Sequence, residues 1–322
     1  MVKLPLRSKI ILVGINVFFL SILISTLVAI YPLELYVSLL PYLLMISAFL
    51  FLLESMSIKV YELGKKVGIV LVLFSLLCLI YPTYIFINQA LISPSINVAG
   101  KNTLKITFQN KYYLNANIEG LTKQAKELDP DIIGFTEINE ISEYQKYLDK
   151  YPYVFKTRLD NLMGVVMFSK YELKDSEALN ASYDSNLDHS PYIKTKVVMP
   201  DKSEVNLLMV HLIAPTGSGF TKLKGDALNI IYSEANKLEG NIVVIGDFNT
   251  TPYSPQISGL RNSSQFYSAS KGKGLLDTWE GPSFLKFQID HAFISNSMKV
   301  NKFEVKDTVG SDHHMIFLET SF

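Results

Sequence analysis

Eight polar residues stand at or near the ends of apolar segments, where carboxylates, amides and imidazoles could act together on a substrate. They are Asn110, Glu137, His211, Asp247, Asn249, Asp290, Asp312 and His313. A charged group in an apolar strand is costly unless it is paired or binds a metal. One such residue is usually a satisfied structural residue. Because these residues occupy six separate places in the chain, they predict one shared site.

The residue types favour a hard metal ion and a phosphoester substrate. Carboxylate and amide oxygens suit Mg²⁺, with Mn²⁺ as the second choice. The sequence has one cysteine and no group of histidines suited to zinc. It also lacks a P-loop and a GxSxG serine elbow. The inventory therefore predicts metal-assisted hydrolysis of a phosphate ester.

The segment VVIGDFNTTPYSP, residues 243–255, shows how a strand end would serve this chemistry. In an extended chain, residues two apart point to the same side, so Asp247 and Asn249 would face one phosphate. The carboxylate would supply a base, the amide would donate a hydrogen bond, and Gly246 would leave the approach open. Asp and Asn also cap turns, and for this segment alone that structural interpretation is equally good.

A sheet-rich domain is predicted to position these residues. Residues 114–128, 142–150 and 223–238 have helical spacing. The predicted strands are 105–110, 131–138, 164–170, 192–199, 204–212, 241–249, 288–295 and 313–322. Strands in close succession, with few helices between them, indicate an α/β or α+β domain.

The first hundred residues predict a membrane anchor. Three uncharged apolar runs, 10–30, 35–53 and 67–87, each approach the ~20 residues that a helix needs to cross a bilayer. One such run would also fit a core helix or a signal peptide, but three in succession fit poorly. The predicted organisation is an anchor with three transmembrane helices in 1–91, a linker in 92–103 and a catalytic domain in 104–322.

The basic residues predict the orientation of this anchor. Lys3, Arg7 and Lys9 precede the first run, and three further lysines lie between the second and third runs. The loop between the first two runs has no Lys or Arg. Because positive charge favours the cytoplasmic side, we expect a cytoplasmic N-terminus and an extracytoplasmic catalytic domain.

The charge of the catalytic domain bears on its substrate. Residues 1–100 hold six of the 30 basic and three of the 30 acidic residues, so residues 101–322 carry a net charge of −3. Nonspecific nucleic-acid binding relies on Lys and Arg, so this balance weakens a nuclease interpretation without excluding a local basic groove. Three hypotheses remain: a nuclease, a phosphoesterase for lipid head groups or other phosphorylated envelope molecules, and a non-catalytic subunit of a membrane complex.

The segments GFTEI, VHL, GDFN, IDHAFIS and GSDH occur in an order that resembles the endonuclease/exonuclease/phosphatase (DNase I-like) superfamily. The resemblance covers residues 101–322, and the preceding apolar runs resemble a membrane-anchored bacterial subgroup. It implies a four-layer α/β sandwich of two packed β-sheets with outer helices. It also implies a bacterial inner or plasma membrane location, with the lipid bilayer and a nucleic acid or phospholipid as partners. A Mg²⁺-dependent phosphodiesterase or nuclease is the first expectation.

The same resemblance implies roles for the site residues. Glu137, Asn110 and Asp312 match metal-binding positions, Asn110 also lying near the phosphate. Asp247 matches the aspartate that orients or deprotonates the attacking water. Asn249 matches the neighbouring residue that holds water or phosphate.

The remaining matches are histidines and their partner. His313 matches the residue that contacts the scissile phosphate, Asp290 its partner, and His211 a second histidine of the DNase I-like branch.

Other positions are predicted to shape the pocket. His189 is a candidate pocket residue, and Lys222 and Lys224 are candidate phosphate contacts, although a solvated loop with lysines at a helix start is an equally good interpretation. His291 and His314 are expected to be packing or rim residues. Gln109 and the His314-Met315 pair depart from the family pattern, which leaves the substrate class open.

Overall fold

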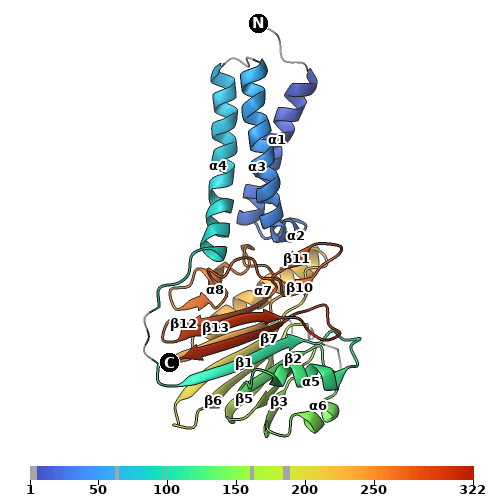
Figure 1. The fold of residues 1–322 in the computed structure, drawn as a ribbon, viewed down its shortest axis with the longest axis vertical. Helices are drawn as coiled ribbons and strands as arrows, with labels where there is room; N and C mark the ends of the chain where they lie inside the picture. Colours follow the sequence, from blue (N-terminus) through green and yellow to red (C-terminus); the bar gives the residue numbers. More distant parts are fainter. Residues whose placement is uncertain (1–5, 62–64, 97, 99, 160–162, 184–188) are drawn as a thin grey trace.

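The structure is a computed structural model that describes residues 6–61, 65–96, 98, 100–159, 163–183 and 189–322. Long helices project from one side of a β-sheet domain (Figure 1). Lys3, residues 62–64 of the predicted basic loop, and residues 97 and 99 of the predicted linker lie outside the described residues.

Two six-stranded mixed sheets form the domain. The first has the order β13-β14-β1-β2-β4-β3, and in it only β1 and β2 are parallel. Its strands are β1 (Thr103–Asn110), β2 (Ile132–Thr136), β3 (Tyr153–Lys156), β4 (Val165–Ser169), β13 (Lys299–Lys306) and β14 (Met315–Ser321). The second sheet has the order β5-β6-β7-β8-β12-β9, with β7 and β8 parallel.

The strands of the second sheet are β5 (Glu172–Asn180), β6 (Pro191–Val198), β7 (Glu204–His211), β8 (Asn241–Asp247), β9 (Phe266–Ser268) and β12 (Asp290–Ser295). A separate short hairpin pairs β10 (Trp279–Glu280) with β11 (Lys286–Phe287).

The sheets pack face to face, and helices cover their outer faces. Side chains of β1, such as Ile106 and Phe108, share one buried core with Leu207 and Met209 of β7. A Cβ on Gly134 would lie 2.3 Å from the Met209 sulfur, so the two sheets approach each other closely at this glycine. The outer helices are α5 (Ile118–Lys126), α6 (Ser142–Tyr147), α7 (Ser218–Asn236) and α8 (Ser258–Arg261). The two packed sheets with outer helices confirm the predicted sandwich.

The two parallel strand pairs bring their carboxyl ends to one side of the sandwich. In the first sheet Asn110 pairs with Thr136, the residue before Glu137. In the second sheet His211 pairs with Asp247, and Asp247 pairs with Asp290 on β12. The sheet register therefore gathers residues that lie far apart in the sequence.

The described residues of the amino-terminal region form four helices: α1 (Leu6–Leu27), α2 (Leu33–Ser38), α3 (Leu40–Tyr61) and α4 (Lys65–Ala90). Two helices in the described part of the chain, not the three predicted, are long and apolar enough to cross a bilayer, at Arg7–Leu27 and Val67–Ala90. The predicted run 35–53 is divided near Leu39, and Pro41 then lies in the first turn of α3, where proline is tolerated. The apolar part of α3, Leu40–Met56, is shorter than a typical span.

A buried polar cluster joins α1, α3 and α4. Glu54 accepts hydrogen bonds from Asn16 Nδ2 (2.8 Å) and Ser75 Oγ (2.8 Å), and its side chain has no exposed surface. Interhelical hydrogen bonds of this kind hold apolar helices in a fixed arrangement.

The sequence patterns missed several elements. Strand β5 is mostly exposed, β13 and β3 are only partly buried, and β9, β10 and β11 are very short. Helix α5 begins at Ile118 rather than residue 114, because the Asn117 side chain accepts a hydrogen bond from Gly120 N (2.9 Å) and caps it.

Candidate active site

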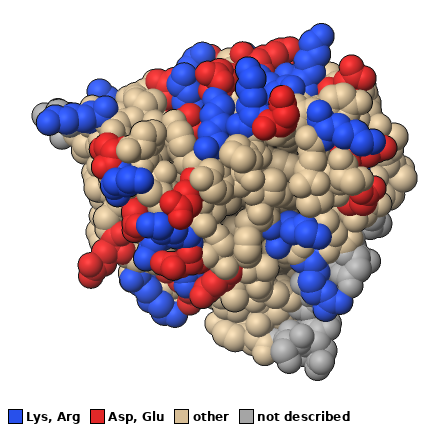
Figure 2. Space-filling model, turned by 90° about the horizontal axis from the view of Figure 1, so that it is seen from below, with Lys and Arg blue, Asp and Glu red and all other residues tan. Residues whose placement is uncertain are grey.

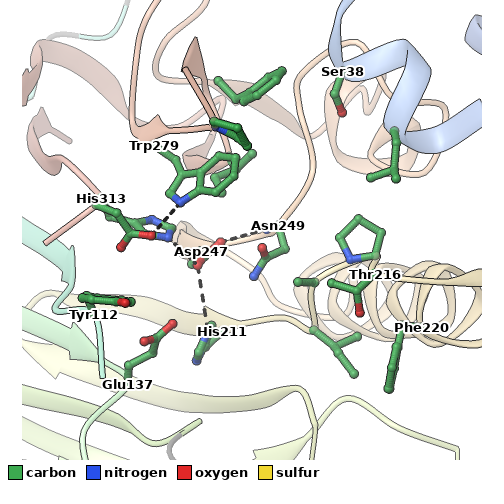
Figure 3. Close-up of a pocket in the computed structure, with 18 of the residues that line it drawn as sticks. Ser38, Tyr112, Glu137, His211, Thr216, Phe220, Asp247, Asn249, Trp279 and His313 are labelled. Carbon is green, nitrogen blue, oxygen red and sulfur yellow. Dashed lines mark hydrogen bonds and ion pairs between the residues drawn. The ribbon is translucent and has the colours of Figure 1, made fainter. Parts of the chain in front are cut away.

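A cavity of about 740 Å³ lies where the two parallel strand pairs end. Its polar floor contains Glu137, His211, Asp247, Asn249, Asp312 and His313 (Figure 3). Asn110 and Asp290 lie directly behind this floor, bonded to Asp247 and His313 respectively. The structure thus brings together all eight strand-end residues.

Asp247 is the centre of this group and is completely buried. Its Oδ2 accepts a hydrogen bond from Asn110 Nδ2 (3.1 Å), and its Oδ1 accepts one from the backbone N–H of Asn249 (2.9 Å). Burial raises the pKa of Asp247 to about 6, with the negative charge of Asp290 adding to the rise and the nearby histidines opposing it. Asp247 is therefore a stronger base than an ordinary aspartate.

His313 lies between two carboxylates. Its Nδ1 is 3.0 Å from Asp290 Oδ2, and its Nε2 is 3.8 Å from Asp247 Oδ2. Burial alone would lower the pKa of His313, but Asp290 and Asp247 outweigh it and raise the pKa to about 10. The ring is therefore an imidazolium at neutral pH.

His211 approaches the same carboxylate from the second sheet. Its Nδ1 lies 2.9 Å from the Met163 carbonyl oxygen, which can only accept, so Nδ1 carries the proton. Its Nε2 is then directed at Asp247 Oδ2, 3.8 Å away.

Glu137 faces the cavity from the end of β2. Its Oε1 accepts a hydrogen bond from Asn110 Nδ2 (3.0 Å), and its Oε2 accepts one from Tyr113 N (2.7 Å). Glu137 has a left-handed φ of 60°, which is uncommon for a residue with a side chain and indicates a geometry imposed by its surroundings.

The structure corrects the prediction that Asp247 and Asn249 both lie in an extended strand. Strand β8 ends at Asp247, and Asn249 has a left-handed φ of 49° rather than an extended backbone. Its Nδ2 donates to the Leu212 carbonyl (2.7 Å), yet the residue still lines the cavity beside Asp247. Gly246 is required for another reason than the predicted one: a Cβ there would lie 2.0 Å from the Val210 carbonyl oxygen of the neighbouring strand β7.

The oxygen-rich floor fits a divalent metal ion. Asp290 Oδ1 and Asp312 Oδ1 are buried without a hydrogen-bond partner in the described part of the chain, so acceptor capacity remains. Among the described residues, ligand atoms of Asp247, Asp290 and His313 lie within 4.8 Å of one another. A protonated His313 has no ring-nitrogen lone pair to offer a metal, however, so we do not assign the ion to this trio. The partly exposed Glu137, with Asn110, is better placed for an ion that keeps most of its waters.

The predicted substrate contacts are not among the cavity-lining residues of the described chain. Lys224 is fully buried and pairs with Glu34 (2.7 Å), so it cannot contact a substrate phosphate. Lys222 pairs with Asp226 (2.6 Å) on the exposed side of α7. His189 lies edge-on to Phe220, with ring centres 6.4 Å apart.

His291 and His314 do not belong to the floor. His291 is buried against Phe248, and burial lowers its pKa to about 4, so it is a neutral packing residue. His314 lies near Glu280 (3.6 Å) and Asp307 (3.6 Å), outside the cavity lining.

Three residues that contribute to the site were not predicted from the sequence. Trp279 donates from Nε1 to Asp312 Oδ2 (2.9 Å) and lines the cavity, and it is the only tryptophan of the chain. Tyr113 contributes a backbone N–H, which sequence cannot reveal. Glu34 is an acid between two apolar runs, which is a detectable signal for a paired residue.

We expect Asp290→Asn to lower the pKa of His313 by about 1–3 pH units, because it removes the nearest negative charge. A raised folded-state pKa stabilises the fold below the unfolded value of 6.5, and this contribution is lost as the pH rises through about 10. The Asp290→Asn variant should therefore lose this stabilising contribution at a lower pH than the wild type does. The measurement is a ¹³C NMR titration of ring-labelled histidines in the metal-free full chain, with His313→Gln identifying the resonance.

Asp307→Asn is the matched control, because this carboxylate is 98% exposed and lies near His314. An unchanged His313 titration in Asp290→Asn would contradict the assigned ion pair.

Comparison with known proteins supports the same chemistry. Residues 95–313 match the model of the Endonuclease/Exonuclease/phosphatase family. Among curated proteins, no relative matches the chain.

Solved structures share the fold at low identity. A humanized D. rerio TDP2 is 15% identical with a TM-score of 0.58, the match covering 68% of this chain and 99% of that one. An Endonuclease/Exonuclease/phosphatase family protein from Bacteroides thetaiotaomicron is 13% identical with a TM-score of 0.55, covering 69% and 95%. The human Nocturnin catalytic domain is 16% identical with a TM-score of 0.54, covering 68% and 94%. The chain belongs to the Endonuclease/Exonuclease/phosphatase family and is a metal-dependent phosphoester hydrolase.

Proposed function

We propose that this protein is a membrane-anchored, Mg²⁺-dependent phosphodiesterase that cleaves its substrate by in-line attack of water. The observation that carries the proposal is the pairing of Asp247, with its raised pKa, and the imidazolium of His313 across 3.8 Å at the cavity floor. A base and a cationic hydrogen-bond donor at one point are what attack on phosphorus requires.

Asp247 accepts the proton of the attacking water. A base acts best when its pKa lies near the working pH, and a pKa of about 6 brings Asp247 closer to neutrality than an ordinary aspartate. Asn110 and the backbone N–H of Asn249 hold the carboxylate in place through one hydrogen bond to each oxygen. His211 Nε2 approaches the same carboxylate and helps to orient the water.

His313 donates to the phosphoryl oxygens, on which negative charge grows during the attack. Asp290 fixes the ring through Nδ1 and keeps it protonated. Asn249 lies on the other side of Asp247 from His313 (Figure 3) and supports the phosphate there.

Glu137, Asn110 and Asp312 would hold the divalent ion, Mg²⁺ in our proposal and Mn²⁺ as the second choice. The ion would supply positive charge that polarises the phosphoryl oxygens. Trp279 orients Asp312 by donating to its Oδ2, which leaves Oδ1 available.

We further propose that the amino-terminal helices anchor the protein in a bacterial inner or plasma membrane, with a cytoplasmic N-terminus and an extracytoplasmic catalytic domain. Large apolar side chains of these helices are exposed, including Ile10, Phe49 and Leu77. A continuous exposed apolar surface is favourable against lipid and costly in water. In this proposal α3 completes the anchor as a third, shorter span beside α1 and α4.

Cleavage of nucleic acid, which would make the protein a nuclease, is a candidate function supported by one comparison. It is favoured by the fold shared with a D. rerio TDP2 solved with a single-strand DNA product, of which the match covers the full length. The face of the domain away from the helices carries interspersed positive and negative side chains rather than a basic stripe (Figure 2). A non-catalytic role as a subunit of a membrane complex does not explain why all eight polar residues converge.

We expect Asp247→Asn to lower kcat for bis(p-nitrophenyl) phosphate by about 10²–10⁴-fold, because the base is lost while the shape is kept. The assay uses the full chain in detergent with Mg²⁺, and chelation should abolish the wild-type rate. Asp175→Asn is the matched control, since Asp175 is exposed, pairs with Lys196 and has a φ that Asn tolerates. A rate for Asp247→Asn within threefold of wild type would refute the assigned base.

We expect Glu137→Gln to weaken Mg²⁺ and Mn²⁺ binding at least about tenfold, because a charged ligand is replaced by a neutral one. Isothermal titration calorimetry measures this without substrate. Glu140→Gln is the control, because Glu140 is exposed and bonds to Ser142 outside the cavity. If Glu137→Gln binds metal as wild type does, the ion belongs elsewhere, with Asp247, Asp290 and His313 the next candidates.

A further inference from the structure

We infer that the short helix α2 is part of the active site, and that the site takes a phosphoester carrying an apolar chain, presented by the membrane that holds the anchor. The inference rests on the proposed function, because it names the substrate class of the same cavity. It is carried by the composition of the cavity walls, the attachment of α2, and the position of the cavity relative to the helices.

The walls above the polar floor are apolar and come from three segments. They are α2 with Leu35 and Leu39, the segment that leads into α7 with Ile213, Ala214 and Pro215 and the first turn of α7 with Phe220, and the β10–β11 hairpin with Pro282, Leu285 and Phe287. The described lining contains no Lys or Arg. A phosphoester that was polar throughout would leave these walls unused, whereas an alkyl chain would remove their surface from water.

A buried ion pair fixes α2 against the catalytic machinery. Glu34 of α2 accepts hydrogen bonds from Lys224 Nζ (2.7 Å), Thr250 Oγ1 (2.9 Å) and Ser254 Oγ (2.7 Å). Lys224 Nζ also donates to the Asn249 carbonyl (3.0 Å). The anchor is therefore connected through two side chains to the turn that follows Asp247.

This pair is costly to bury and specific in geometry. Glu34 and Lys224 are 1% and 0% exposed, and removing either partner would leave an uncompensated charge. Burial lowers the pKa of Lys224, and the Glu34 carboxylate opposes that shift. Such a pair contributes more to a defined position than to stability, and here the position is that of α2 over the cavity.

The cavity lies on the side of the domain that faces the helices. In Figure 1, α2 sits at the base of the helical bundle, next to the β10–β11 hairpin. Val37 of α2 packs with Ile22 of α1 and Ile85 of α4. Tyr42 of α3 accepts a hydrogen bond from Lys286 N (3.1 Å), which joins the hairpin to the same bundle. With α1 and α4 in a bilayer, the walls formed by α2 and by the β10–β11 hairpin would lie at its surface.

Two synthetic esters test this inference, methyl p-nitrophenyl phosphate and octyl p-nitrophenyl phosphate below its micelle concentration. In both, water attacks phosphorus, the P–O bond to the aryl group breaks, and p-nitrophenolate leaves with an alkyl phosphate remaining. The full chain in nanodiscs is assayed with Mg²⁺. We expect kcat/KM for the octyl ester to exceed that for the methyl ester at least tenfold.

Variants identify the cavity walls that contact the alkyl chain of the substrate. Leu35→Glu, on a side chain that is 43% exposed, and Leu285→Glu on the opposite wall should reduce this ratio at least fivefold. An added carboxylate repels both anionic esters equally, so the ratio reports the chain alone. Leu275→Glu is the matched control and should keep the ratio, because Leu275 is 61% exposed, outside the cavity lining, and follows Gly274, which bonds to the end of α4.

The outcomes distinguish a failure of the apolar-chain site from a failure of the proposed function. Equal kcat/KM for both esters, or a ratio that neither cavity variant alters, overturns the apolar-chain site and leaves phosphoester hydrolysis intact. A single-stranded oligodeoxynucleotide cleaved with higher kcat/KM than the octyl ester overturns it in favour of nucleic acid. If none of the three substrates is hydrolysed while Mg²⁺ binds, the proposed function itself fails, and the inference with it.

Discussion

The buried carboxylate of Asp247 is the constraint on which the rest of the structure depends. It has no exposed surface, so its charge must be balanced by the protein rather than by water. The groups around it come from both sheets: Asn110 from the first, His211 from the second, and His313 from the segment before β14. The two sheets must therefore pack in a register that brings their carboxyl ends together, and the close contact at Gly134 permits it.

Charge balance at this point also sets the chemistry. Two neighbouring carboxylates, Asp247 and Asp290, would repel each other, and the proton on His313 between them relieves that repulsion. Burial, together with the charge of Asp290, raises the pKa of Asp247 and makes it a better base, whereas Asp290 and Asp247 raise the pKa of His313 against the effect of burial and keep it cationic. A second buried pair, Glu34 with Lys224, lies behind the Asn249 turn and joins this centre to α2. The helical region thus contributes to the site as well as preceding it.

The gathering of polar residues from separate strand ends could be predicted from sequence, whereas several elements around them could not. Polar residues at the ends of apolar strands are conspicuous because burying them is costly, so Asp247, His313 and Glu137 stood out. Lys224 was misassigned because a lysine in a polar segment looks solvated, and its partner Glu34 lies 190 residues away. Strands β5 and β13 carry exposed charged faces that hide their alternation, and α2 was hidden in a longer apolar run. The left-handed backbone at Asn249 belongs to a local turn in which Asp247 Oδ1 accepts a hydrogen bond from Asn249 N, a pattern that Asp and Asn favour and that competes with the extended conformation predicted for this segment.

The stereochemical course at phosphorus tests the central claim most directly, because the claim is that water activated by Asp247 displaces the leaving group in one in-line step. A p-nitrophenyl phosphorothioate diester of single configuration would be hydrolysed by the full chain in H₂¹⁸O, and the configuration of the labelled product determined. A single in-line displacement by water gives inversion at phosphorus, with one ¹⁸O incorporated, and this is the result we expect. Retention would show two displacements through a covalent enzyme intermediate and would contradict the role assigned to Asp247.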